Sequence, residues 1–245
     1  MRQVQSAIEC SELDRERFGI AVAWARHMRR EMVPHALEWC RKESVRLLIA
    51  RCEGSDWPTV HALEKSGFLL MDTLVYYCLR VSGNIPKVDV QGVSFRQASL
   101  HDATAVKQAA ARAFANYQGH YHNDPLLPAE KCDAIYSDWA YRSVVNNSVA
   151  DTVLLALVQD QVAGFIALRQ TDDHEADIPL NAVVPEFQRR GIYRALLAQA
   201  LTWCQRHGLL RCCISTQLTN TAAQKAWVRL GFEPLHAVHT FHKWF

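Results

Sequence analysis

One short segment of the chain, Val183 to Tyr193, combines residue types that bind anions. It reads Val-Val-Pro-Glu-Phe-Gln-Arg-Arg-Gly-Ile-Tyr, which predicts a strand that ends at Pro185 and a helix that begins near Gly191. The free N–H groups of a helix N-terminus act as about half a positive charge, and glycine lets a ligand approach the backbone closely. Arg189 and Arg190 add fixed positive charge. The segment suits two phosphates of a nucleotide-type cofactor, but an ordinary strand-to-helix turn with solvated arginines fits it equally well.

Several titratable residues could act as a general base. His236, His239 and His242 lie in a predicted strand, where alternation places His236 and His242 on the same face. Imidazole has a pKa of about 6.5, so such a histidine could take a proton from an ammonium group through water. We favour His242 as the catalytic base, although each histidine could instead cap a strand edge. Glu175 and Asp177 are alternative bases, or simply surface carboxylates.

The loop from Tyr117 to Pro125 is dense in hydrogen-bonding groups. Its side chains suit a polyhydroxylated ligand, so we predict that Tyr117, His120, His122 and Asp124 bind the substrate. A structural loop whose polar groups satisfy one another is the alternative.

The elements that must position these residues follow from hydrophobic periodicity and turn signals. From residue 93 onward, the sequence predicts strands over 93–97, 153–158, 162–168, 178–184, 211–216 and 236–244, and helices over 102–116, 128–146, 193–207 and 221–230. This order indicates a mixed α/β domain, in which one strand leads directly into the glycine-containing helix start.

Glycine, asparagine and proline cluster over residues 81–87, which predicts a boundary between an N-terminal domain, 1–85, and a catalytic domain, 90–245. Residues 56–68 can be laid over 220–232 without a gap, and each segment is a predicted helix that ends in Gly-Phe. We interpret the N-terminal domain as a degenerate half-copy of the second. The N-terminal domain has no counterpart of the Arg189-Arg190-Gly191 segment, so we expect it to bind no anion at the corresponding place.

The overall composition excludes several classes of protein. Hydrophobic residues make up 49% and charged residues 21%, and the net charge of +2 gives no support for nucleic-acid or membrane partners. The longest apolar run is far shorter than the roughly twenty residues that a membrane span needs. We expect a soluble, cytoplasmic protein. The eight cysteines form no CxxC pair and no zinc-like array, so we expect free, mostly buried thiols and no metal.

The segment Val183 to Tyr193 and its surroundings resemble the GNAT superfamily of acyl-CoA-dependent N-acetyltransferases, whose phosphate loop reads Gln/Arg-x-x-Gly-x-Gly/Ala. The chain matches the first four positions and departs at the last, where Tyr193 replaces a small residue. The flanking Val-x-Pro, Leu196-Leu197 and Asn220…Ala223…Gly231-Phe232 also fit the family. The resemblance covers about residues 90–245. It implies a GNAT-like domain with a central mixed sheet, preceded by a smaller half-GNAT-like α/β domain.

The resemblance also implies acetyl-CoA as co-substrate and direct attack of an amine on the thioester in a ternary complex. The backbone amides of residues 188–193 would hold the CoA pyrophosphate, and an N–H group at Val183 would polarise the thioester carbonyl. Asn220 would touch the pantetheine arm, cap a helix, or do both. The loop over 117–125 lies in a region that faces the acceptor in this family. The implied coenzyme-binding residues are Val183, Val184, Gln188, Arg189, Arg190, Gly191, Ile192, Tyr193 and Asn220.

Many members of the superfamily use a tyrosine, seven positions beyond this asparagine, to protonate the leaving thiolate. The chain has Trp227 at this catalytic position, and an indole cannot serve as that acid. Either another group supplies the proton, or the thiolate leaves unassisted, because a thiol pKa of about 8.5 makes it a tolerable leaving group.

The segments 11–19 and 215–223 resemble two-domain members that acetylate nucleotide-linked amino sugars, of the TDP-fucosamine acetyltransferase type. We therefore predict an N-acetyltransferase that transfers the acetyl group of acetyl-CoA to a small amine, in the first place a nucleotide-activated amino sugar. A homodimer is one possible assembly. One alternative is transfer of a longer acyl group from CoA or an acyl carrier protein. A catalytically inactive acyl-CoA-binding module is the other.

Overall fold

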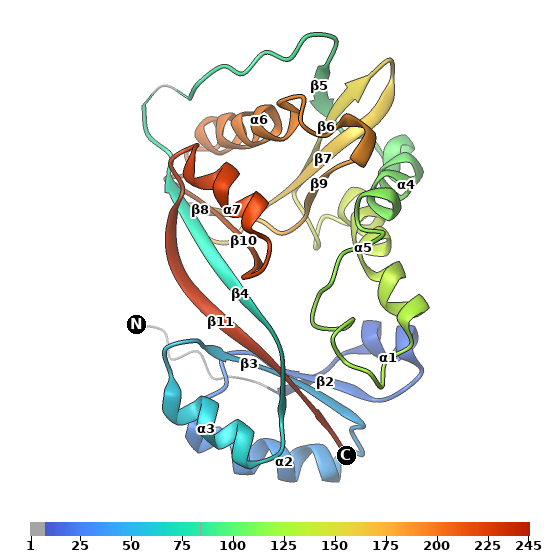
Figure 1. Ribbon diagram of the computed structural model, residues 1–245, viewed down its shortest axis with the longest axis vertical. Coiled ribbons are helices and arrows are strands. Elements are labelled where there is room, and N and C mark those ends of the chain that lie inside the picture. Colours follow the sequence, from blue (N-terminus) through green and yellow to red (C-terminus); the bar gives the residue numbers. More distant parts are fainter. Residues whose placement is uncertain (1–7, 84) are drawn as a thin grey trace.

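The computed structural model describes residues 8–83 and 85–245, which form one eleven-stranded sheet and seven α-helices (Figure 1). The strand order is β1-β2-β3-β11-β4-β10-β8-β7-β6-β5, and β9 pairs with β7 beside this path. This mixed sheet confirms the predicted α/β class. The strands are β1 (Ile8–Cys10), β2 (Val22–Ala25), β3 (Leu47–Glu53), β4 (Leu69–Arg80), β5 (Ser94–Gln97), β6 (Thr152–Val158), β7 (Gln161–Gln170), β8 (Glu175–Ile178), β9 (Asn181–Val183), β10 (Arg211–Gln217) and β11 (Glu233–Trp244). The helices are α1 (Glu12–Phe18), α2 (Val33–Lys42), α3 (Trp57–Lys65), α4 (Ala103–Ala113), α5 (Ala129–Val145), α6 (Ile192–Arg206) and α7 (Thr221–Val228).

The predicted elements lie within a few residues of the observed ones, with one exception. The single strand predicted over 178–184 is wrong, because the chain forms two short strands there, β8 and β9, with Pro179 and Leu180 between them. Proline has no N–H group to donate to a ladder. Beyond Ile178 the chain keeps hydrogen bonding to β7 but parts from β10.

Three apolar cores hold the helices against the sheet. Helices α6 and α7 share one core with β7, β8 and β10, and it contains Leu196 and Trp227. Helices α2 and α3 share a second core with β2, β3 and β11. The third core joins α4, α5 and β6 to Phe18, Trp24 and Ile49 of the N-terminal segment. The N-terminal segment therefore packs directly against helices of the second half of the chain.

The two strand–helix–strand units that the sequence relates, β3-α3-β4 and β10-α7-β11, also match in their capping. Asp56 precedes α3 and accepts a hydrogen bond from the Thr59 N–H group, while Asn220 precedes α7 and accepts one from the Ala223 N–H group. Both units then turn through a glycine with positive φ before the next strand. Each unit thus begins and ends its helix in the same way.

The pairing of the four strands in these units is also symmetric. A shift of 164 residues (220 − 56), the separation of the two capping residues, converts every residue pair between β3 and β11 into a pair between β10 and β4. The pair Leu47–Trp244, for example, corresponds to the pair Arg211–Arg80. The β4–β11 pairing has two register shifts, one between Pro234 and His236 and one between Thr240 and Phe241, and the same 164-residue shift converts each into the other. The units therefore exchange their last strands around a pseudo-two-fold axis.

One consequence of this exchange is that β4 lies between β10 and β11, the two strands that flank α7 in the chain (Figure 1). A strand from the predicted N-terminal domain, 1–85, thus completes the sheet of the predicted catalytic domain, 90–245. The division into two domains stays a prediction. Residues 1–7 of the first domain and residue 84 of its boundary lie outside the described residues.

Two of the eight cysteines differ from the sequence-based expectation. Cys78 of β4 and Cys213 of β10 lie directly opposite one another and form a disulfide, so the expectation of free thiols is wrong for this pair. The carboxylate of Glu175 lies within 4.8 Å of both sulfur atoms, but the disulfide leaves neither as a thiolate for a metal. The remaining six are free, and all but Cys10 are buried. No helix in the described part of the chain is long and apolar enough to cross a membrane.

Candidate functional site

An opening in the sheet lies where β9 and β10 diverge. Strand β8 pairs with β10 as far as Ile178 and Ile214, whereas β9 pairs with β7 and with no other strand of the described residues. The far end of β10, Ser215 to Gln217, pairs with β4 on its other edge. The facing edges of β9 and β10 therefore pair with no strand of the described residues, and such edges can bind an extended ligand by backbone hydrogen bonds.

The backbone of Val183 faces this opening. The Val184 N–H group and the Leu180 carbonyl bond to β7, so by alternation the polar groups of Val183 point the other way. The Val183 carbonyl accepts a hydrogen bond from Gln188 Nε2 at 3.0 Å. The close approach of β9 to β7 depends on Gly164, where an added Cβ would lie 2.9 Å from the Ala182 carbonyl oxygen.

A positively polarised turn follows β9 directly. Arg189 and Gly191 both have positive φ, at 63° and 83°, which turns the chain sharply into α6. The first N–H groups of a helix have no intrahelical partners, and no capping side chain accepts from those of α6. Arg190 lies over the Phe187 ring at 5.4 Å, and a Cβ added at Gly191 would meet only the Val90 side chain, at 3.7 Å. The turn therefore fits the anion site that the sequence predicts, with exposed donors and room at the glycine.

The two departures from the family pattern contact each other. Trp227 is 1% exposed, and its Nε1 donates a hydrogen bond of 2.7 Å to the Tyr193 hydroxyl oxygen. The Trp227 ring also meets Tyr77 edge to face. Burial raises the pKa of Tyr193, so its hydroxyl keeps its proton at neutral pH. The phenol can still donate that proton, because its oxygen is the acceptor in the bond from Trp227.

Asn220 serves the fold at this opening. Its Oδ1 accepts from the Ala223 N–H group, and its Nδ2 donates to Thr216 Oγ1 at 2.9 Å. The helix-capping role that the sequence allows is therefore present, and a contact with pantetheine stays a prediction.

Three of the predicted site residues form a buried chain. His242 is 1% exposed; its Nδ1 lies 2.6 Å from Asp124 Oδ2 and its Nε2 lies 2.9 Å from His120 Nδ1. Burial would raise the pKa of Asp124, but hydrogen bonds from His242, the Leu126 N–H group and Trp244 lower it overall. Burial, and then the neighbouring His242, hold the pKa of His120 well below its usual value, so His120 is neutral at pH 7. This burial separates His242 from solvent, and its role as catalytic base stays a prediction.

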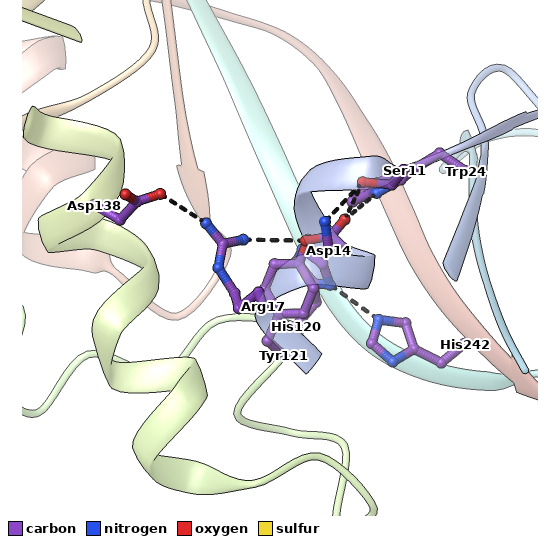
Figure 2. A network of polar contacts seen from close by, with 8 residues as sticks. All are labelled: Ser11, Asp14, Arg17, Trp24, His120, Tyr121, Asp138 and His242. Atoms are coloured by element: carbon purple, nitrogen blue, oxygen red, sulfur yellow. Dashed lines mark hydrogen bonds and ion pairs between the residues drawn. The ribbon is translucent and has the colours of Figure 1, made fainter. Parts of the chain in front are cut away.

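A second buried node, centred on Asp14, lies beside this chain (Figure 2). Asp14 accepts hydrogen bonds from Ser11, Arg17, Trp24 and the Tyr121 hydroxyl. Its side chain thereby ties α1 and β2 to the loop over 117–127. The sequence marks this segment only through the cap before α1 and the glycine after it, and neither signal identifies the buried carboxylate.

Two other predicted substrate-binding residues lie in the same loop but outside the buried chain. Tyr117 packs against Phe114 and Tyr136, and burial raises its pKa to about 12. His122 accepts a hydrogen bond from the Gly119 N–H group, and its Nε2 lies 3.3 Å from Asp133. Only Tyr117 of these two interacts with β10 at the opening, where Thr216 lowers its pKa against the larger effect of burial.

A polar sheet face that the sequence analysis missed lies beside the opening. Residues that pair across β3, β11 and β4 place Arg51, Thr240 and Asp72 in one row. A cleft of about 180 Å³ opens on this face, lined by Arg26, His27, Arg51, Glu53, Tyr76 and His236 among others. Strand alternation could have placed these side chains on one face, but only the strand exchange brings them together.

The divergent strands and the turn before α6 are compatible with a coenzyme site, and sequence comparison gives the family of the chain. The profile of the acetyltransferase (GNAT) family matches residues 108–232. The chain belongs to this family and is an acyl-CoA-dependent acetyltransferase.

Two curated relatives share 26% identity with the chain. One is dTDP-fucosamine acetyltransferase of Escherichia coli, aligned over 201 residues that cover 82% of this chain and 80% of that protein. The other is the spore coat polysaccharide biosynthesis protein SpsD of Bacillus subtilis, aligned over 143 residues, 58% of this chain and 48% of that protein.

Solved structures show the same fold at lower identity. A GCN5-related N-acetyltransferase from Sphaerobacter thermophilus superposes with a TM-score of 0.68 at 15% identity, covering 97% of this chain and 76% of that one. A tandem GNAT protein from the clavulanic acid biosynthesis pathway superposes with a TM-score of 0.63 at 15% identity, covering 92% and 76%. The predicted GNAT-like fold is confirmed.

Proposed function

We propose that this protein transfers the acetyl group of acetyl-CoA to the amine of a nucleotide-activated amino sugar. The observation that carries the donor half is the uncapped α6 N-terminus directly after the open edge of β9. The amides of residues 188–193 would hold the coenzyme's pyrophosphate, and pantetheine would extend along Val183 toward the opening. Acetyl-CoA, when bound, supplies the activated thioester.

The acceptor half rests on the polar sheet face. Its cleft is lined by Arg26, Arg51 and Glu53. Arg26 forms an ion pair with Glu9 at 3.4 Å, whereas Arg51 forms none with a carboxylate of the described residues, so we expect Arg51 to be the cation that binds the phosphates. Arginine binds phosphate oxygens through paired hydrogen bonds. A diphosphate in this cleft would place the attached sugar over the neighbouring strands, β4 and β10. The relation to dTDP-fucosamine acetyltransferase favours the same class of acceptor.

The chemistry that we propose is direct acyl transfer. The neutral amine attacks the thioester carbon, and the Val183 N–H group stabilises the negative charge that develops on the carbonyl oxygen. The carbon–sulfur bond then breaks, and the Tyr193 hydroxyl is the proton donor that the structure offers at the Trp227 position. Fixing both substrates in one geometry supplies much of the rate enhancement.

An acceptor panel tests this proposal. The purified protein is incubated with acetyl-CoA and either dTDP-fucosamine, other sugar-nucleotide amines, polyamines or amino acids, and free CoA thiol is measured together with product mass. We expect turnover with the sugar-nucleotide amines and little with the others. Preference for a longer acyl-CoA would change the donor, and binding of acetyl-CoA without turnover on any amine would contradict the proposed enzyme activity.

A further inference from the structure

Two buried oxygen atoms beside the opening lack hydrogen-bond partners. Asp72 of β4 is 9% exposed and Gln217, the last residue of β10, is 8% exposed. Gln217 Nε2 donates to Asp72 Oδ2 at 3.3 Å, but Asp72 Oδ1 and Gln217 Oε1 accept no hydrogen bond. An unsatisfied buried acceptor costs about 1–3 kcal/mol, so two neighbouring ones indicate a donor that is absent from the free protein.

Within the described residues, no cationic side chain hydrogen-bonds to either of the two oxygens. Burial, and to a smaller extent the charge of Asp72, raise the pKa of Tyr76, Tyr117 and Tyr136, which surround it from β4, the loop and α5. Arg51 of β3 donates to Thr240 of β11 instead. The tyrosine hydroxyls therefore stay protonated at neutral pH.

The pair also lies where the acceptor amine must arrive. Gln217 is at the carboxyl end of β10, past the point where β10 parts from β8, and so borders the opening between β9 and β10. Asp72 shares a sheet face with Arg51 and with Tyr76, two residues that line the cleft. An acceptor anchored in the cleft would therefore run along this face toward the thioester.

The loop over 117–127 covers the pair. Asn123 Nδ2 donates to the Met71 carbonyl. A Cβ added at Gly119 would clash with the Tyr136 hydroxyl and would lie 3.7 Å from Gln217 Nε2, so a larger residue at position 119 would require the Tyr136 side chain to move. The acceptor would have to displace part of this loop when it enters.

We propose that Asp72 and Gln217 bind the amine of the acceptor and that Asp72 accepts its proton. This inference rests on the proposed function and names a residue of the predicted N-terminal half as part of the acetyl-transfer site. The ammonium group donates one proton to Asp72 Oδ1 and a hydrogen bond to Gln217 Oε1. The freed lone pair forms the bond to the thioester carbon, the carbon–sulfur electron pair leaves on sulfur, and the nitrogen loses its second proton to solvent as the amide forms.

The test compares variants with acetyl-CoA and dTDP-fucosamine as probes. Asp72→Asn keeps the shape and removes the base, so kcat should fall about 10²- to 10⁴-fold. Gln217→Met removes one acceptor, so KM for the sugar nucleotide should rise roughly tenfold or more. The calorimetric Kd for acetyl-CoA and the melting temperature should change little in both. Asp173→Asn, the same chemical change at an exposed position between β7 and β8, is the matched control.

A second acceptor separates catalysis from structure. The aminooxy analogue of the same sugar nucleotide carries an unprotonated nitrogen at neutral pH, so Asp72→Asn should lose much less activity with it. Equal losses with both acceptors, or full activity of Asp72→Asn in an active enzyme, would overturn this inference and leave the proposed function standing. Failure of the unmodified protein to acetylate any sugar-nucleotide amine would overturn the proposed function and this inference with it.

Discussion

At the scale of single residues, the site combines side chains whose roles depend on contacts far apart in the sequence. Tyr193 and Trp227 each depart from the family pattern, and the sequence shows both departures but not that they hydrogen-bond. That contact depends on how α6 packs beside α7. The position of His242 could likewise be predicted only in part. Strand alternation gives the face of the sheet on which it lies, but not its burial between Asp124 and His120.

Tyr193→Phe tests whether the Tyr193 hydroxyl is the acid that protonates the leaving thiolate. We expect kcat to fall about 10²-fold, because the thiolate loses its proton donor, while the Kd for acetyl-CoA stays within a fewfold range. Thiol release and calorimetry measure the two quantities. Trp227→Tyr should preserve or raise the rate if it restores an acid at that position. Unchanged turnover of Tyr193→Phe would show that the thiolate leaves unassisted.

Asp177 gives a pH dependence with a defined sign. Burial raises the pKa of Asp177 from 3.8 to about 6, so its ionised form is disfavoured in the folded state. Its favourable contribution to folding is present below pH 3.8 and is lost as the pH rises through about 6, which amounts to roughly 3 kcal/mol. Asp177→Asn should therefore gain stability relative to the unmodified protein as the pH rises from 3.8 to about 6, measured by chemical denaturation. A constant difference across that range would show that Asp177 titrates normally.

At the scale of elements, the break between β8 and β9 creates the opening in which we propose that acetyl-CoA binds. Periodicity predicts one apolar strand over 178–184, because it registers side-chain alternation and not the loss of a partner strand. The turn into α6 was easier to predict, since glycine, arginine and the following apolar repeat are local signals. The positive φ of Arg189, however, is a property of the folded turn.

Substitution at Gly164 tests the geometry of the β7–β9 pair. An added Cβ lies 2.9 Å from the Ala182 carbonyl oxygen and 3.1 Å from both Leu196 Cδ1 and Val183 Cγ2. Gly164→Ala should cost about 1–3 kcal/mol of stability, and Gly164→Val should cost more and weaken acetyl-CoA binding by displacing Val183. Denaturant unfolding and calorimetry provide the measurements. If Gly164→Val kept normal stability and affinity, β9 would not need this close approach.

At the scale of the whole molecule, two related units exchange their last strands. The sequence shows the relation through the Asp56–Phe68 and Asn220–Phe232 segments, and hydrophobic patterning predicts most of the elements. It could not predict that β4 lies between β10 and β11, because strand partners depend on long-range pairing that no local pattern encodes. For the same reason, the sequence did not identify Asp72 as part of the site.

This exchange predicts that the catalytic half does not fold alone. Residues 87–245 lack β4, which leaves the facing edges of β10 and β11 unpaired, so we expect an aggregated or unfolded fragment. A full chain with a specific protease site at residues 83–87 should stay assembled after cleavage. Gel filtration and circular dichroism distinguish these states. A stable, monomeric 87–245 fragment that binds acetyl-CoA would show that the two halves are independent domains.

Every proposed step depends on the donor occupying the turn between β9 and α6. The most direct measurement is therefore a calorimetric titration with acetyl-CoA, for the unmodified protein and for a variant that carries Arg190→Glu and Gly191→Glu. We predict micromolar binding to the unmodified protein and its loss in the variant, because two carboxylates would repel the pyrophosphate and a side chain at residue 191 would fill its place. Absence of binding to the unmodified protein, or equal binding to both, would contradict this account of the site.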